Sequence, residues 1–481
     1  MKTILTVLFA FLCSQLFAAR PNVIVILSDD VGYGDVGCYG ATKIKTPNLD
    51  RLAREGRRFT NAYTPGSVCS PTRYGLMVGR YFWREPRHHP TGVHAPGGPL
   101  LFDLDRITLA KLFQKNGYAT GAVGKWHLGL GPGDNPSIRY DFSQEEIKPG
   151  PLEVGFDYFY GMAANVGNSP HIYIENHRFV GRKPGDKVEM IGRGDVKPWS
   201  PDAEFKEDRV AGDIAKKAVE FIKRPKDKPF FLYYATNIAH NNITPAPEFA
   251  GKSACGTYGD FVQELDAHVG WVFDALQQTG VLDNTLIIFT SDNGGVVAEN
   301  ERLAAQWQAK QMGHAICGAL RGRKHSIYEG GFRVPFIVRW PGNVPAGTQS
   351  DEVLCLNDVL ASCAALLGEK LPANAGEDSF NMLPLWKGEP NAQGRASVIL
   401  DSALGVFAIR AGDWKLIQRT EFSEPPAKGK KARPNPENQN QLYNLAADPA
   451  ETKNLWSEKP DVVKRLTALL AEAKKNGRTR P

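Results

Sequence analysis

The sequence predicts an α/β protein with a large mixed, mostly parallel sheet flanked by helices, and a smaller C-terminal α+β subdomain carrying an antiparallel sheet. Continuous apolar runs, typical of strands buried on both faces, alternate with segments of helical periodicity over residues 20–388. Polar side chains directly follow several of these runs, where open α/β sheets place their ligands. After Gly388 the pattern changes to short strands and one long helix. We therefore expect a main domain over 20–388 and a subdomain over 389–481.

Residues 1–19, MKTILTVLFAFLCSQLFAA, have the composition of a secretory signal peptide. A lysine precedes an apolar run that ends in small residues, and this run is too short for a spanning helix. No other apolar run approaches the length that a membrane span needs. We expect an exported protein, periplasmic or secreted, without a membrane span. An uncleaved anchor is the alternative.

The elements of the main domain can be assigned in order. Apolar runs predict buried strands over 21–28, 119–123, 230–235 and 285–290. Apolar side chains at helical spacing, with start and stop signals, predict helices over 46–55, 74–80, 108–116, 210–222 and 258–276. In the subdomain, strands are expected at 397–400, 407–410 and 414–417, followed by a loop over 420–440. A final helix begins at Pro460, with its inward side chains at Val462, Val463, Leu466, Leu469, Leu470 and Ala473.

Composition limits the classes of function. The chain has 481 residues, of which 42% are hydrophobic and 23% charged, as in ordinary soluble enzymes. No long basic run with interleaved aromatic residues is present, so a nucleic-acid partner is not expected. Besides Cys13 and Cys69 there are five cysteines, too few for a disulfide scaffold and enough for at most two bridges.

Two predicted strands end in side chains that offer oxygen. Asp29-Asp30 follow the first strand, and Asp292-Asn293 follow the strand at 285–290. Oxygen ligands without sulfur or imidazole indicate a hard cation, and three carboxylates with an amide favour one Ca²⁺ ion over Mg²⁺. Taken singly, either pair is also common turn chemistry after a strand.

A second group of residues suits an anionic ester. Cys69-Ser70-Pro71-Thr72-Arg73 has the pattern Cys-x-Pro-x-Arg, and cations occur at Lys125, His127, His240 and Lys324. A sulfate ester carries charge on three oxygens, and its departing alkoxide needs a proton, so it requires cations and a proton donor. The alternatives are a half-buried cysteine beside a turn proline and structural histidines past the strands.

Together these segments resemble the type I sulfatases of the alkaline phosphatase superfamily. The likeness covers nearly all of the chain after the predicted signal peptide. The matching segments are residues 21–34, 46–80, 124–129, 291–294, 320–335 and 442–454.

The resemblance implies a specific site. Cys69 would be converted to Cα-formylglycine by a formylglycine-generating or radical maturation enzyme. The modified residue would bind calcium with Asp29, Asp30, Asp292 and Asn293. Arg73 and His127 would hold the nucleophile, Lys125, His240 and Lys324 would hold the sulfate, and His240 or Lys324 would protonate the leaving oxygen. The hydrated aldehyde would attack sulfur and release the alcohol, and its second hydroxyl would then expel sulfate.

Substrate choice is expected to come from loops over the site. His171, Arg302 and His314 are the candidate substrate-binding residues. By analogy with the family, the substrate is a sulfated saccharide, with galactose or N-acetylgalactosamine sulfate preferred. The chain departs from the common family pattern near Lys324, where Arg323 and His325 replace small residues.

Two alternative functions remain open at this point. A phosphate or phosphonate ester hydrolase of the same superfamily would be favoured by a second metal site, for which few spare His and Asp residues exist. A non-enzymatic binder of sulfated glycans would have no need of the intact motif at Cys69.

Overall fold

The computed structural model describes residues 20–87, 92–95, 97–135, 140–191, 195–419 and 439–480. The predicted signal peptide and most of the predicted 420–440 loop lie outside these residues. No described helix is both long and apolar enough to cross a membrane. All six cysteines in the described part of the chain carry free thiols.

The main sheet has ten strands in the order β12-β2-β11-β10-β1-β9-β3-β4-β5-β6. The five strands β10, β1, β9, β3 and β4 pair in parallel, whereas β11 is antiparallel to both of its neighbours. The prediction of a mixed, mostly parallel sheet is therefore confirmed. The strands are β1 (Asn22–Ser28), β2 (Arg57–Tyr63), β3 (Ala119–Lys125), β4 (Tyr158–Met162), β5 (Ile174–Glu175), β6 (Arg178–Phe179), β9 (Phe230–Ala235), β10 (Thr285–Ser291), β11 (Phe336–Arg339) and β12 (Thr348–Cys355).

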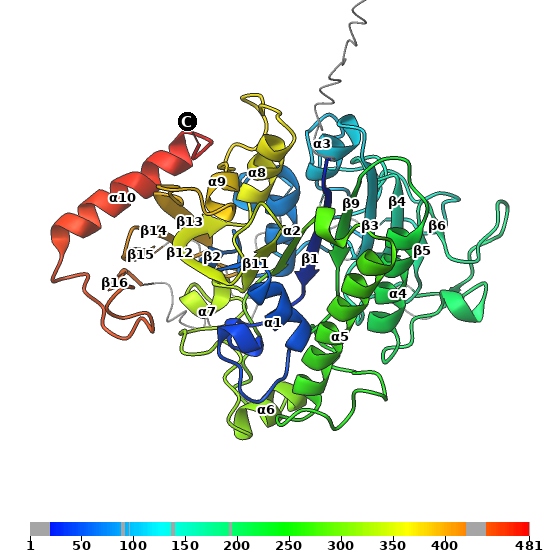
Figure 1. Cartoon of the computed structure of the whole chain (residues 1–481), viewed down its shortest axis with the longest axis horizontal. Helices are drawn as coiled ribbons and strands as arrows, with labels where there is room; N and C mark the ends of the chain where they lie inside the picture. The colour runs from blue at the N-terminus through cyan, green and yellow to red at the C-terminus, as the bar shows by residue number, and fades with distance from the viewer. Residues whose placement is uncertain are drawn as a thin grey trace, which may run out of the picture.

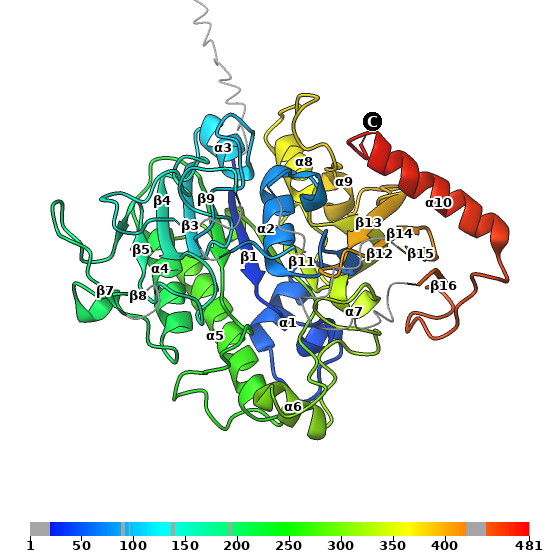
Figure 2. The same ribbon diagram turned by 180° about the vertical axis from the view of Figure 1, so that it is seen from behind.

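Helices cover both faces of this sheet because its central strands are apolar on both sides. In β1, Val23 and Val25 belong to one apolar cluster and Ile24 and Ile26 to another, as the alternation of side chains along a strand requires. Figure 1 shows α1 (Pro47–Arg54), α4 (Val210–Lys223) and α5 (Thr257–Gln278) on one face. Figure 2 shows α2 (Cys69–Val78), α3 (Leu109–Lys115) and α8 (Asp358–Leu366) on the other.

Short elements connect these layers. They are the helices α6 (Ala304–Gln311), α7 (Glu329–Phe332) and α9 (Leu383–Trp386), the hairpin of β7 (Met190–Ile191) and β8 (Asp195–Val196), and 3-10 turns at Tyr33–Asp35, Gly37–Tyr39, Phe82–Arg84, Pro201–Ala203 and Leu282–Asn284.

The helix that follows the Cys-x-Pro-x-Arg motif begins earlier than predicted. It starts at Cys69 rather than at Tyr74, so the whole motif lies in its first turns. Pro71 is tolerated there because the first residues of a helix have no intrahelical partner for their N–H groups. The consequence is that Cys69 is held at the amino end of a regular helix.

The C-terminal region forms a second sheet of four antiparallel strands in the order β13-β14-β15-β16. Helix α10 (Pro460–Lys475) packs on it through the buried side chains Leu466 and Leu470. The expectation that Leu469 also points inward is wrong, since this side chain is 37% exposed. Leu469 precedes Leu470 by one residue, about 100° around the helix, and so leaves the buried face. The strands are β13 (Ser397–Asp401), β14 (Phe407–Ala411), β15 (Trp414–Gln418) and β16 (Gln441–Asn444). The boundary at 388 stays a prediction.

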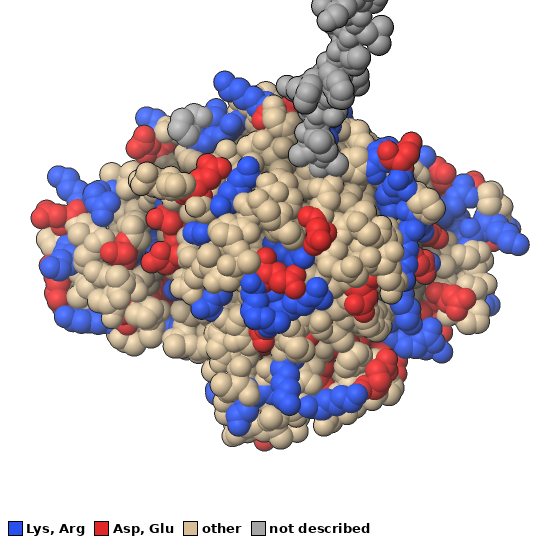
Figure 3. Space-filling view, in the orientation of Figure 1, with Lys and Arg blue, Asp and Glu red and all other residues tan. Residues whose placement is uncertain are grey.

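Charged side chains of both signs are interspersed on the face shown in Figure 3. Basic side chains gather at the right of this view, over α4, whose sequence carries Lys216, Lys217 and Lys223.

Candidate active site

The two oxygen-bearing pairs predicted from the sequence lie side by side. β1 and β10 are adjacent and parallel, and Ser28 pairs with Ser291, so the residues after them share one edge of the sheet. The backbone N–H of Asp30 donates to Asp292 Oδ1 over 3.2 Å, and Asn293 Nδ2 donates to Asp30 Oδ1 over 2.7 Å. Gly294 allows this turn to lie against α7, because a Cβ atom there would be 1.8 Å from the carbonyl oxygen of Gly330.

The arrangement of oxygens fits a hard cation. Asp29, Asp30 and Asp292 can place one carboxylate oxygen each within 4.8 Å of one another, and all three are buried. Asn293 Oδ1 is also buried and has no hydrogen-bond partner. A buried polar oxygen without a partner is costly unless a ligand or an ion satisfies it. The donor set therefore matches the calcium site expected from the sequence.

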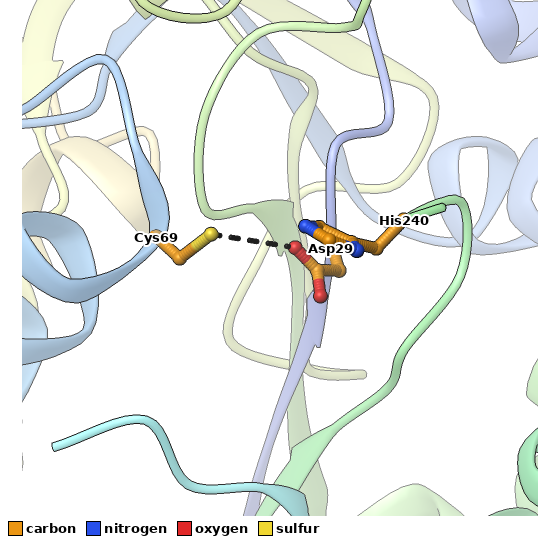
Figure 4. A group of neighbouring side chains, drawn as sticks. All are labelled: Asp29, Cys69 and His240. Carbon is orange, nitrogen blue, oxygen red and sulfur yellow. Dashed lines mark hydrogen bonds between the residues drawn. The ribbon is translucent and has the colours of Figure 1, made fainter. Parts of the chain in front are cut away.

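Cys69 lies directly beside these oxygens. Its Sγ points toward Asp29, 3.8 Å from Oδ1, with His240 close by (Figure 4). Lys324 Nζ is 3.7 Å from the same sulfur. The side chain is only 2% exposed, and burial raises the pKa of its thiol to about 11 despite the nearby Lys125 and Lys324.

Three buried cations pair with the three aspartates. Lys125 Nζ is 2.6 Å from Asp29, Lys324 Nζ is 2.6 Å from Asp30, and Arg73 Nη2 is 2.7 Å from Asp292. Burial opposes ionisation of Asp29 and Asp30, but these cations and His240 hold the pKa of both carboxyl groups below the ordinary value. Asp29 and Asp30 thus stay ionised and available as metal ligands.

The two predicted histidines occupy different positions. The His240 side chain is 18% exposed, with Nε2 3.9 Å from Asp30 Oδ2, and burial together with Lys324 lowers its pKa. Its Nδ1 lies 2.6 Å from the carbonyl oxygen of Asn241, which orients the ring. His127 is buried, with Nε2 3.0 Å from the carbonyl oxygen of His94 and Nδ1 without a partner. Burial, Lys125 and Arg73 hold the pKa of His127 well below its ordinary value.

The predicted substrate-binding residues have partners outside this cluster. His171 Nδ1 is 2.7 Å from Asp195, and His314 Nε2 is 2.7 Å from the buried Asp35. Arg302 lies in an exposed turn before α6. In the described part of the chain, no hydrogen bond or ion pair joins any of the three to the cluster around Cys69. Their role in substrate binding stays a prediction.

Some residues that support the site were not identified from the sequence. The Tyr233 hydroxyl in β9 lies 3.5 Å from Arg73 Nη1. Behind the Lys324 segment, Lys415 Nζ is 3.1 Å from Glu329 and 2.8 Å from Glu451, and all three side chains are fully buried or nearly so. A tyrosine or lysine inside a short apolar strand gives no local signal of such a long-range contact.

Two surface grooves lie elsewhere on the molecule. One, of about 690 Å³, runs between α4 and α5 and is lined by residues such as Lys216 and Trp271. The other, of about 720 Å³, lies beside residues 341–346. Neither is lined by a residue of the Cys69 cluster.

Several known proteins are similar to this chain over most of its length. A family model described as Sulfatase matches residues 21–369. The chain is 37% identical to an N-acetylgalactosamine-6-O-sulfatase of Bacteroides thetaiotaomicron, over 95% of this chain and 93% of the relative. It is 33% identical to human arylsulfatase A, over 94% of this chain and 86% of the relative. A solved structure from work on the metabolism of multiple glycosaminoglycans by Bacteroides thetaiotaomicron matches with a TM-score of 0.85 at 36% identity, covering 95% of this chain and all of that one. This likeness confirms the alkaline phosphatase-like fold.

Proposed function

The chain belongs to the sulfatase family and is a sulfuric ester hydrolase, and we propose that it removes sulfate from a sulfated saccharide through a modified Cys69. The observation that carries the proposal is the position of Cys69, whose sulfur lies between an aspartate of the oxygen cluster and the ammonium group of Lys324. The proposed nucleophile therefore lies beside the proposed cation site and beside a lysine that would bind sulfate.

We propose that Asp29, Asp30, Asp292 and Asn293 hold one calcium ion, with residue 69 as a further ligand. The support for this proposal is the unpartnered Asn293 oxygen among three buried carboxyl groups. Bound there, the ion would withdraw charge from the sulfate oxygens.

The unmodified Cys69 is poorly suited to attack sulfur. With a thiol pKa of about 11, it is protonated at neutral pH, so almost no thiolate is present. Conversion to formylglycine by a maturation enzyme would supply a hydrated aldehyde with two hydroxyl groups on one carbon. Arg73 and His127 would hold this modified residue in place.

The remaining charges are placed to bind the ester. Lys125 and Lys324 bring two ammonium groups to the site, and the aspartate beside Lys324 raises its pKa above the ordinary value despite burial. Lys324 can therefore hold a sulfate oxygen at neutral pH, and Lys125 would bind a second one. His240 is partly exposed, which suits a group that would face the departing alcohol. His240 or Lys324 would give the proton that the departing oxygen needs.

For the substrate, we propose the 6-sulfate of N-acetylgalactosamine or galactose. The support is the 37% identity to an N-acetylgalactosamine-6-O-sulfatase over nearly the full length of both chains. We also propose that the protein is exported, since residues 1–19 have signal-peptide composition.

The test is sulfate release by the matured full chain from a panel of N-acetylgalactosamine 6-sulfate, N-acetylgalactosamine 4-sulfate and galactose 6-sulfate. We expect turnover of a 6-sulfate and none with Cys69→Ala, which should retain the wild-type unfolding temperature. Activity retained by Cys69→Ala would contradict the proposed nucleophile. Faster turnover of phosphate or phosphonate esters would favour the alternative hydrolase. Glycan binding without any turnover would favour a non-enzymatic binder.

A further inference from the structure

Ser67, two residues before Cys69, joins two segments that are distant in the sequence. Its carbonyl oxygen accepts a hydrogen bond from the backbone N–H of His325 over 2.9 Å. Its Oγ accepts one from the backbone N–H of Ala403 over 3.1 Å. The segment after Lys324 and the turn between β13 and β14 therefore meet directly beside the nucleophile segment.

His325 is exposed, whereas its neighbour Lys324 is buried against Cys69. Its backbone has a φ of 77°, in the left-handed region that glycine adopts at little cost and most other residues avoid. A histidine held in this conformation beside an active site needs a reason other than local folding.

The chemistry of the ring suits an uncharged polar ligand. Partial burial of His325 and the positive charge of Lys324 lower its pKa to about 4, so the ring is neutral near pH 7 and can both donate and accept a hydrogen bond. The adjacent Arg323 is engaged by Glu299, with its Nη2 2.5 Å from the carboxylate. A sugar hydroxyl or acetamido group fits this environment better than a second anion does.

Leu404 supplies the complementary apolar surface. It lies next to Ala403 in the β13–β14 turn, and its side chain is 49% exposed, although it is a large apolar residue. One face of a pyranose ring presents C–H groups, which such a side chain can cover.

We propose that His325 and Leu404 form a subsite for the sugar ring that carries the sulfate, with His325 hydrogen-bonded to a hydroxyl or acetamido group and Leu404 against the C–H face. This inference rests on the proposed sulfatase function. It makes His325 a determinant of specificity for sugars over other sulfate esters.

The test compares kcat/KM for N-acetylgalactosamine 6-sulfate with that for a simple aryl sulfate, which has no ring hydroxyl to bind. His325→Gly suits the left-handed backbone and should fold at least as well as the wild type. We expect it to lower kcat/KM for the sugar about tenfold, the effect of one lost hydrogen bond, through KM more than kcat. Activity on the aryl sulfate should change less than about twofold.

Two further variants complete the design. His325→Asn tolerates the left-handed conformation and keeps a donor and an acceptor, so it should recover part of the sugar activity. Asn391→Gly is the matched control, because Asn391 is an exposed non-glycine residue with a φ of 61°. It should leave both activities unchanged.

The outcomes separate the two proposals. An equal loss on sugar and aryl sulfates in His325→Gly, or no loss on either, would overturn the subsite while leaving the sulfatase function intact. Absence of sulfate release from both substrates by the matured wild type would overturn both proposals.

Discussion

Arg73 Nη2 lies 2.7 Å from Asp292 Oδ2, and neither side chain has any exposure to solvent. Arg73 Nε donates to the same oxygen over 3.1 Å, and Nη1 donates to the carbonyl oxygen of Lys125 over 3.0 Å. One guanidinium group in helix α2 therefore fixes the ends of β10 and β3. This links the segment of the proposed nucleophile to the segments of a proposed metal ligand and a proposed sulfate-binding lysine.

We expect Arg73→Ala to destabilise the fold by about 3–5 kcal/mol, because it leaves the carboxylate of Asp292 buried without its partner. Arg73→Lys should lose less stability than Arg73→Ala, because lysine keeps the positive charge although it lacks the planar guanidinium group. Urea unfolding measures both. The control is Arg209→Ala, whose ion pair with Asp213 is partly exposed and should contribute at most about 1 kcal/mol. Equal stability of Arg73→Ala and the control would show that the buried pair is not structural.

Removal of calcium should lower both stability and activity. At a calcium concentration of 100 times Kd, the bound ion is expected to add about 2.7 kcal/mol to the free energy of unfolding. Differential scanning calorimetry with chelator and with added calcium measures this shift. Asp30→Asn should abolish the stabilisation by calcium. The control is Asp283→Asn, which should keep the stabilisation because the side chain of Asp283 is 89% exposed. An unfolding temperature that does not respond to calcium would contradict the assigned ligands.

The central part of the fold was predictable because the strands β1, β9 and β10 are buried on both faces and so read as unbroken apolar runs. The polar pairs after β1 and β10 could be expected at the same edge of the sheet, since parallel strands end at one edge. That β1 and β10 are neighbours, and that the antiparallel β11 follows β10, depends on pairing across the sheet, which no local pattern encodes.

The surroundings of the site were harder to predict for the same reason. The contacts of Ser67 with His325 and Ala403 join residues more than 250 positions apart. The contact of His314 Nε2 with Asp35 likewise depends on tertiary packing, so no local pattern in the sequence indicates it.

Glu264 should make stability depend on pH. Burial raises the pKa of its carboxyl group to about 7, although the backbone N–H of Ala246 donates to it. The folded state therefore binds this proton more tightly than the unfolded state. The contribution of this group to the free energy of unfolding is fully present below the ordinary pKa of 4.5. It is lost as the pH rises through about 7. The total loss is on the order of 3 kcal/mol.

Glu264→Gln removes this titration. We expect the variant to match the wild type in unfolding free energy near pH 4.5 and to exceed it near pH 8. Glu220→Gln, at a side chain that is 51% exposed, is the control and should not change the pH dependence. A difference between Glu264→Gln and the wild type that is the same at both pH values would rule out the buried titration.

Lys415 should be essential for docking the C-terminal sheet. Its ammonium group is buried between Glu329 of α7 and Glu451, so Lys415→Met leaves two carboxylates without a partner. We expect a loss of about 3–5 kcal/mol and faster proteolysis of the C-terminal region. Lys453→Met, at an exposed pair with Glu458, should change stability by less than about 1 kcal/mol. Equal effects of the two substitutions would mean that the buried network does not hold this sheet.

The central claim is that residue 69 acts as a modified nucleophile beside the oxygen cluster. Mass spectrometry of the tryptic peptide over residues 59–73, from protein produced in its native host, tests it most directly. We predict the mass of a peptide in which the CH₂–SH group of Cys69 has become an aldehyde or its hydrate, together with sulfate release by the same preparation. An unmodified thiol in an active preparation would contradict the claim.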